Sequence, residues 1–263
     1  MPILNVARIC LCYERQGRGH PLLFISGLGA DHALWTPVVA LLKDRYRCIT
    51  FDNRGIGQSS RPRSGYTATQ LARDTAGLLR RLGIPQAHVL GMSMGGLVAQ
   101  TMALQWPETV ASLVLVGSFA RADARLMHVL NSRKVMQRQM ARYDYFHALA
   151  AWMFGPDALA RPGFADAFAR RAAENPYPQA LHAFDQLVDG IGQFDSRPLL
   201  KNVRKPTLVM VGEQDILTPP YLSQELARRV RGARLEVLPG LGHFCAVEDP
   251  AGFAERVHWF LAC

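Results

Sequence analysis

The sequence has no apolar run long enough to cross a membrane. Its continuous apolar stretches, such as LVLV at 113–116, are much shorter than the roughly 20 residues that a membrane-spanning helix needs. The first residues, MPILNVARICLCYERQG, also lack the basic segment, apolar stretch and small-residue cleavage site of a secretory signal. We therefore expect a cytoplasmic protein with no membrane span.

Cysteine is scarce, and its spacing favours neither disulfide nor metal chemistry. The five cysteines are an odd number and form no disulfide framework and no metal-ligand pairs with histidine. We expect reduced thiols and no metal site. Cys10 and Cys12 are two residues apart and would point to the same face of a strand, which favours a role in packing over redox chemistry. The cysteines are Cys10, Cys12, Cys48, Cys245 and Cys263.

Acidic residues are fewer than basic ones, 21 against 30, and the formal net charge is +9. A basic balance favours acidic partners, of which nucleic acid is the first to consider. The chain nevertheless lacks zinc-finger spacing, an aromatic-laced RNA-binding signature and any long basic block. We therefore predict that the protein binds no nucleic acid.

The sequence does contain an alternation of strand-like and helix-like segments. Its 263 residues, 49% of them apolar, suffice for one large α/β domain or a domain with an insertion. Short apolar runs rich in β-branched residues alternate with helical patterns, as at 67–84. This alternation predicts a doubly wound, mostly parallel sheet with helices on both faces. The strand-like runs lie at 7–14, 21–26, 46–52, 88–93, 112–117, 206–212 and 234–240.

One region breaks this alternation. From about residue 119 to 198 the apolar residues keep helical spacing, and no convincing strand follows until 206. We therefore predict that residues 1–118 and 199–263 form the sheet-containing core and that residues 119–198 form an inserted helical segment.

The clearest chemical signal surrounds Ser93. The segment GMSMGG at 91–96 lies where a strand ends and a helix begins, which is the context of a nucleophile elbow. Such a tight turn leaves no room for a side chain at Gly91 or Gly95. The serine would then be exposed at the carboxyl edge of the sheet, with the amide of Met94 at a helix N-terminus. Glycine and serine also make ordinary turns, so the motif needs partners elsewhere in the chain.

A nucleophilic serine needs a base and an acid that orients the base. Among eight histidines, His243 stands out because LPGLGHF at 238–244 is a glycine-rich loop between the last strand and the final helix. The end of the preceding strand offers two carboxylates, Glu213 and Asp215. We predict that Asp215, which lies deeper in its loop, orients His243, and that Glu213 makes a loop hydrogen bond.

A second amide is needed to stabilise an oxyanion, and SGLGAD at 26–31 can supply it. Glycines on both sides of Leu28 would allow its amide to point inward. The alternative is that these glycines simply make a turn. We expect the amides of Leu28 and Met94 to form the oxyanion hole.

Together these segments resemble the α/β-hydrolase superfamily over nearly the whole chain, and most closely its small capped esterases and lactonases. That group includes 3-oxoadipate enol-lactonases and pimeloyl-carrier-protein methyl ester esterases. The resemblance implies an eight-stranded type of sheet, a helical cap at 119–198, no cofactor, and Ser93, Asp215 and His243 as nucleophile, acid and base. It also implies a structural ion pair or loop brace for Arg54. The family usually has histidine where this chain has Ser26.

The insertion supplies candidate substrate and partner contacts. Its apolar side chains could line an acyl pocket, or they could merely attach the cap to the core. The candidates for the pocket are Met127, Met136, Phe146 and Trp152. Lys134, Arg138 and Arg142 have helical i, i+4 spacing and would form a basic stripe, either a solvated cap face or a docking site for an acidic acyl carrier protein.

We therefore predict a cofactor-free serine hydrolase that cleaves a small carboxylic ester or lactone through an acyl-enzyme. Two alternatives remain open at this point. A cofactor-free perhydrolase or haloperoxidase would use the same three residues, with peroxide in place of water. A hydrolase-fold ligand receptor with slow turnover would form a tight ligand complex instead.

Overall fold

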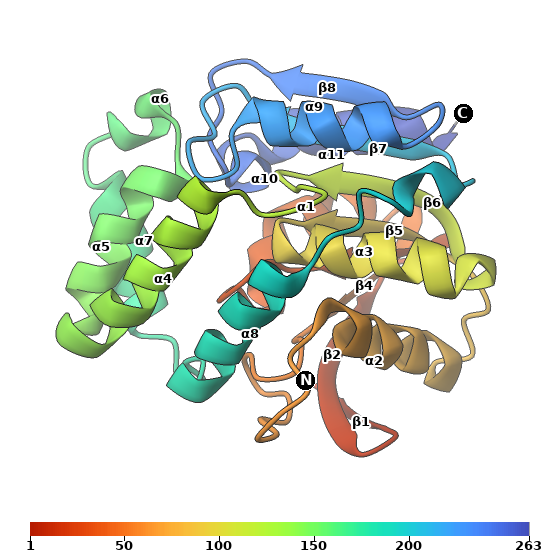
Figure 1. The fold of residues 1–263 in the computed structure, drawn as a ribbon, viewed down its shortest axis with the longest axis horizontal. Coiled ribbons are helices and arrows are strands. Elements are labelled where there is room, and N and C mark those ends of the chain that lie inside the picture. Colours follow the sequence, from red (N-terminus) through yellow and green to blue (C-terminus); the bar gives the residue numbers. More distant parts are fainter. Residues whose placement is uncertain (263) are drawn as a thin grey trace.

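The computed structural model describes residues 1–262, and its centre is an eight-stranded sheet in the order β1-β2-β4-β3-β5-β6-β7-β8 (Figure 1). The pairs β1–β2 and β2–β4 are antiparallel, whereas every pair from β4 to β8 is parallel. The predicted mostly parallel sheet is therefore confirmed. The strands are β1 (Ile3–Val6), β2 (Ile9–Gln16), β3 (His20–Ile25), β4 (Tyr46–Phe51), β5 (Ala87–Met92), β6 (Val110–Val116), β7 (Thr207–Gly212) and β8 (Arg234–Leu238).

Helices cover both faces of the sheet because alternate strand residues point to opposite sides. Leu23 and Ile25 of β3 pack with α2, α3 and α9, while Leu22 and Phe24 of the same strand pack with α1 and α11. Figure 1 shows the first group of helices in front of the sheet and the second behind it. These core helices are α1 (Thr36–Leu42), α2 (Ala68–Arg81), α3 (Met94–Gln105), α9 (Pro220–Arg229), α10 (Cys245–Glu248) and α11 (Pro250–Ala262).

Helix α2 illustrates how the sequence sets the boundaries. The Thr67 hydroxyl accepts a hydrogen bond from the Gln70 amide and caps the helix, and Gly83 follows its end with φ of +68°. Both signals are local, which is why they can be read from the sequence. Strand β1 cannot be read in this way, since it is only four residues long and joins β2 through Ala7 at φ of +56°. Sequence analysis did not predict β1.

Residues 119–198 contain five helices, α4 to α8, between β6 and β7. An antiparallel bridge between Arg121 and Asp195 brings the two ends of this segment together. Figure 1 shows α4 to α7 beyond the end of the sheet at which β8 terminates, so they lie over the carboxyl edge of the strands. The helices are α4 (Ala124–Gln139), α5 (Arg142–Met153), α6 (Pro156–Leu159), α7 (Phe164–Ala173) and α8 (Leu181–Gln193). Within residues 1–262, no helix is both long and apolar enough to cross a membrane.

Candidate active site

Ser93 occupies a strained turn between β5 and α3, with φ of +54° and ψ of −120°. The flanking glycines are required by the surrounding backbone. A Cβ on Gly91 would lie 2.3 Å from the carbonyl oxygen of Gly95, and a Cβ on Gly95 would lie 2.1 Å from that of Ile25. The glycine pattern is thus explained by steric exclusion at a tight elbow, as the sequence predicts.

His243 and Asp215 form a buried pair beside this turn. The Nδ1 atom of His243 lies 2.7 Å from Oδ2 of Asp215, and each residue is only 2% exposed. The other carboxylate oxygen of Asp215 accepts hydrogen bonds from the amides of Leu217, at 3.0 Å, and Thr218, at 2.8 Å. A carboxylate fixed in this way favours a proton on Nδ1 of His243, which leaves Nε2 free to accept one.

Thr218 is a part of this arrangement that the sequence did not reveal. Its hydroxyl is fully buried and lies 2.8 Å from Oδ2 of Asp215, 2.9 Å from the carbonyl oxygen of Gly117 and 3.0 Å from Nδ1 of His243. Gly117 has φ of +48°, and a Cβ there would lie 3.1 Å from Nδ1 of His243. Both residues therefore shape the space in which the imidazole sits.

Glu213, the other carboxylate on this loop, is exposed and accepts a hydrogen bond from the amide of Gly240 at 3.1 Å. It thus makes the loop hydrogen bond that we expected, and Asp215 is the carboxylate in contact with the histidine.

Ser93 and His243 both line a cavity of about 1250 Å³ between the sheet edge and the inserted helices. The loop after β3 passes close to the serine, since a Cβ on Gly27 would lie 3.1 Å from Cβ of Ser93. Leu28 lines the same cavity, and Met94 is the buried first residue of α3. The structure therefore brings both predicted oxyanion loops to the serine.

Ser26 braces the loop that carries Leu28. Its hydroxyl donates to the carbonyl oxygen of Asp31 at 3.1 Å and accepts a hydrogen bond from the indole of Trp35 at 3.0 Å. The serine that stands in place of the family's usual histidine thus fastens the two ends of this loop to each other.

Two further charged residues have structural contacts. Arg54 makes a buried two-point ion pair with Asp74, with Nε–Oδ2 at 2.5 Å and Nη2–Oδ1 at 2.8 Å, as the family resemblance implied. Glu248 accepts hydrogen bonds from the amides of Gly155, at 2.9 Å, and Gly242, at 2.8 Å. Burial raises the pKa of Glu248, although these two bonds act in the opposite direction. The Glu248 carboxylate therefore ties the inserted segment to the loop of His243.

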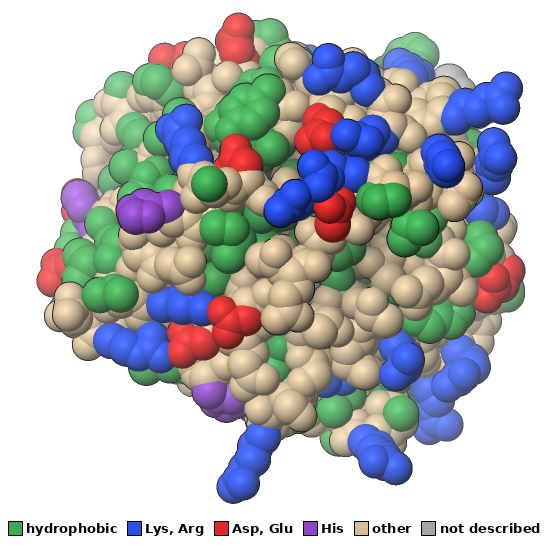
Figure 2. Space-filling model, viewed as in Figure 1, with side chains coloured by type: hydrophobic (Ala, Val, Ile, Leu, Met, Phe, Trp, Pro, Cys, Tyr) green, Lys and Arg blue, Asp and Glu red, His purple; other side chains and the backbone are tan. Residues whose placement is uncertain are grey.

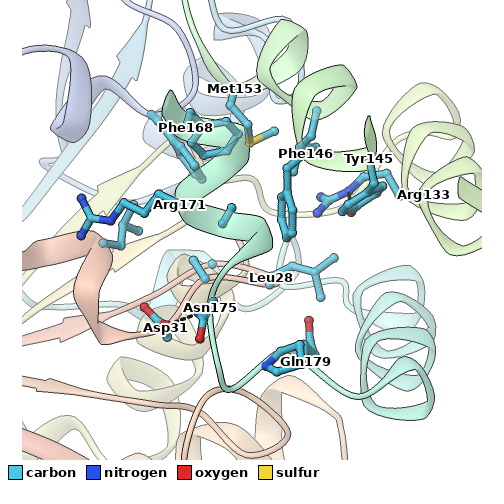
Figure 3. A pocket seen from close by; sticks show the side chains of 18 of the residues that line it. Leu28, Asp31, Arg133, Tyr145, Phe146, Met153, Phe168, Arg171, Asn175 and Gln179 are labelled. Atoms are coloured by element: carbon cyan, nitrogen blue, oxygen red, sulfur yellow. Dashed lines mark hydrogen bonds between the residues drawn. The ribbon is translucent and has the colours of Figure 1, made fainter. Parts of the chain in front are cut away.

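The cap side of the cavity differs from our expectation. Phe146 lines it (Figure 3), but Met127, Met136 and Trp152 are not among its lining residues. These three side chains are partly buried against the apolar core, and the methyl end of Met127 faces Gly192 of α8. The expectation that they line the pocket is wrong.

Helix rotation explains the difference for Met127 and Met136. The residues of α4 that face the cavity recur at spacings of three and four, and these two methionines lie on other faces of the helix. Helix α4 turns Leu126, Leu130, Arg133 and Gln137 to the cavity, and α5 turns Tyr145, Phe146, Leu149 and Met153.

The basic stripe is largely paired within the insertion. Lys134 Nζ lies 2.5 Å from Oδ1 of Asp189, and Arg138 forms an ion pair with Asp185, both acids of α8. Arg142 donates to two backbone carbonyl oxygens across the cavity rim. Figure 2 shows basic and acidic side chains next to each other on this part of the surface. Docking of an acidic carrier stays a prediction, and it would have to compete with these ion pairs.

Comparisons with known proteins agree with this geometry. Residues 20–250 match the family model described as the alpha/beta hydrolase fold. The chain belongs to that family. The crystal structure of the enol-lactonase from Burkholderia xenovorans LB400 superposes with a TM-score of 0.90, at 27% identity and over 100% of both chains. The predicted α/β-hydrolase fold is therefore confirmed.

Two curated relatives of this α/β hydrolase have different names. A candidate carbamate hydrolase, RutD, of Azorhizobium caulinodans is 30% identical over 262 residues, covering 99% of this chain and 98% of the relative. A candidate non-heme bromoperoxidase, BpoC, of Mycobacterium tuberculosis is 32% identical, covering 97% of this chain and 98% of the relative. The fold and the family of this chain are thus established, whereas the names of its relatives give different reactions.

Proposed function

We propose that this α/β hydrolase cleaves carboxylic esters or lactones by nucleophilic catalysis at Ser93. The observation that carries the proposal is the buried 2.7 Å contact between His243 and Asp215 beside a serine held at φ of +54°. A strained backbone at a polar residue, next to an oriented imidazole, is the arrangement that an activated serine requires.

In the proposed reaction, Oγ of Ser93 attacks the carbonyl carbon while Nε2 of His243 takes the hydroxyl proton. Asp215 keeps the imidazole in the required orientation and stabilises its positive charge. The amides of Leu28 and Met94 donate hydrogen bonds to the oxyanion, and the position of Met94 at a helix N-terminus supports this role.

The tetrahedral intermediate then collapses, and His243 returns its proton to the leaving alcohol or enol oxygen. A water molecule, deprotonated by His243, attacks the acyl-enzyme and releases the acid and Ser93. No group beyond this chain, substrate and water is needed to balance these steps.

The test is the replacement Ser93→Ala, assayed with a short-chain 4-nitrophenyl ester. Removal of the nucleophile should lower kcat by at least about 10⁴-fold. Ser64→Ala, at an exposed serine, is the matched control and should retain full activity. Retention of turnover by a folded Ser93→Ala protein would exclude Ser93 as the nucleophile.

Peroxide is a second candidate acceptor for the same acyl-enzyme, and the 32% identity to BpoC favours testing it. Hydrogen peroxide would replace water in the second step and release a peracid. Peracid formation that depends on both the ester and Ser93 would support this activity, whereas simple hydrolysis in the presence of peroxide would exclude it.

A further inference from the structure

The cap side of the cavity contains a buried guanidinium that has no acidic partner. Arg133 of α4 is 4% exposed, and its Nε donates to the Tyr145 hydroxyl at 3.0 Å. Its carbon Cζ lies 5.2 Å from the centre of the Phe184 ring. Within residues 1–262, Arg133 forms no ion pair, and its terminal Nη1 and Nη2 atoms have no hydrogen-bond acceptor.

A second unpartnered polar group lies beside it. Gln179, in the segment between α7 and α8, has a buried side-chain amide whose nitrogen and oxygen have no partner among the described residues. A Cβ on Gly29 would lie 3.7 Å from Nη2 of Arg133 and 3.7 Å from Oε1 of Gln179. The two polar groups therefore flank the same point on the loop that carries Leu28, as Figure 3 shows.

Three carboxylates line the cavity and none pairs with Arg133: Glu174 is exposed, and the other two are engaged elsewhere. Asp31 accepts hydrogen bonds from the side chain of Asn175, at 2.8 Å, and the amide of Ala33, at 3.0 Å. Asp166 accepts one from the hydroxyl of Tyr143 at 2.5 Å. Neither is within ion-pair distance of Arg133, so neither neutralises its charge.

A buried, unpaired cation is unfavourable unless a counter-charge binds with it. The free end of a guanidinium presents parallel N–H groups that match the two oxygens of a carboxylate, and a glutamine amide can donate to the same group. The aromatic face of Phe184 holds the guanidinium without consuming those donors.

We propose that the cavity recognises an ester or lactone that carries a free carboxylate, bound by the terminal nitrogens of Arg133 and by the amide of Gln179. This inference rests on the proposed hydrolysis at Ser93 and names its substrate class. The carboxylate sits on the cap side of Leu28, and the scissile carbonyl sits at Ser93. A neutral substrate of the same length leaves the Arg133 donors unpaired and is therefore disfavoured.

The test compares monomethyl esters of straight-chain dicarboxylic acids, of four to eight carbons, each with its own dimethyl ester. The unmodified protein should have the higher kcat/KM for the monomethyl ester at the best chain length. Arg133→Gln should lower kcat/KM for that ester by about 30-fold or more, mainly through KM, and change the dimethyl value by less than about threefold.

Arg138→Gln is the matched control, since Arg138 is on the same helix but is exposed and paired with Asp185. It should leave both esters unaffected. Gln179→Leu should lower kcat/KM for the monomethyl ester by about tenfold, and it provides a second variant if Arg133→Gln does not fold.

A binding measurement separates this inference from the proposed reaction. Calorimetric titration of the Ser93→Ala protein with the best monomethyl ester should show binding that Arg133→Gln abolishes. That result supports the carboxylate site even if the protein fails to hydrolyse esters. Three results would overturn the carboxylate site. The first is an equal loss of kcat/KM for the monomethyl and dimethyl esters in Arg133→Gln, and the second is no preference of the unmodified protein for the monomethyl ester. The third is binding of the monomethyl ester to Ser93→Ala that survives the added Arg133→Gln substitution.

Discussion

Two histidines at opposite edges of the same sheet show what distinguishes a candidate base from a structural residue. His243 follows β8 at the carboxyl edge, where its Nδ1 lies 2.7 Å from Asp215. His88 lies near the start of β5, where its ring is 4.3 Å from that of His20 and its Nδ1 is 2.8 Å from the hydroxyl of Ser112.

The partners of these histidines differ in charge, and this difference sets their chemistry. A neighbouring carboxylate stabilises the positive charge of a protonated imidazole, whereas burial and the charge of a second histidine destabilise it. Burial, followed by the charge of His20, lowers the pKa of His88 to about 4. The carboxyl edge of a parallel sheet is also where loops from several strands converge. Position and partner together, and not residue type, therefore distinguish His243 as the proposed base.

The largest effect should come from removing the charge beside His243. Asp215→Asn keeps the shape of the side chain but should lower kcat for a 4-nitrophenyl ester by about 10⁴-fold, because the amide does not stabilise the protonated imidazole. Glu213→Gln is the control on the same loop and should lower kcat by less than twofold. Equal effects from the two substitutions would remove the distinction between the two carboxylates.

A smaller effect should appear in stability at the other edge of the sheet. The folded-state pKa of His88, about 4, is below the ordinary value of 6.5. Its neutral form therefore contributes stability that is fully present above pH 6.5 and is lost as the pH falls through 4. The difference between 6.5 and 4 corresponds to about 3.4 kcal/mol for a fully buried group, and solvent screening of the half-buried His88 ring reduces the expected fall in the free energy of unfolding to about 2 kcal/mol.

The measurement is denaturant unfolding at a series of pH values for the unmodified protein and His88→Asn. The substitution should flatten the pH dependence by the amount that His88 contributes and leave ester hydrolysis unchanged. His128→Gln, at an exposed histidine of α4, should leave the pH dependence unaltered. If the free energy of unfolding of His88→Asn depends on pH as it does in the unmodified protein, His88 is not the source of this pH dependence.

The features that the sequence predicted are those with local causes. Steric exclusion at Gly91 and Gly95 marks the elbow, and the chain order of Ser93, Asp215 and His243 follows from loops at one sheet edge. Sequence analysis can still miss the contact that a residue makes with the site, even when that residue is only two or three positions from a recognised motif. Thr218 contacts the imidazole, but in the sequence it resembles an ordinary residue before a helix that begins with proline.

The features that the sequence did not predict depend on how distant helices rotate and pack. Met127 is next to the cavity-lining Leu126 in the sequence but on another face of α4. The prediction of a basic stripe considers only residues that are close in the sequence. The acidic partners of the stripe are on α8, 47 positions from Arg138 and 55 from Lys134. The spacing of one helix does not reveal which other helix will face it.

We propose that His243, and not His88, activates Ser93. The direct test is intact-mass measurement of labelling with an aryl phosphonate that reacts with activated serines. The unmodified protein should gain one phosphonyl group, located at Ser93, and Ser93→Ala should gain none. His88→Gln should be labelled at the normal rate, and His243→Gln at least about 100-fold more slowly. Labelling at another residue would exclude Ser93 as the activated serine, and an undiminished rate in His243→Gln would exclude His243 as the residue that activates it.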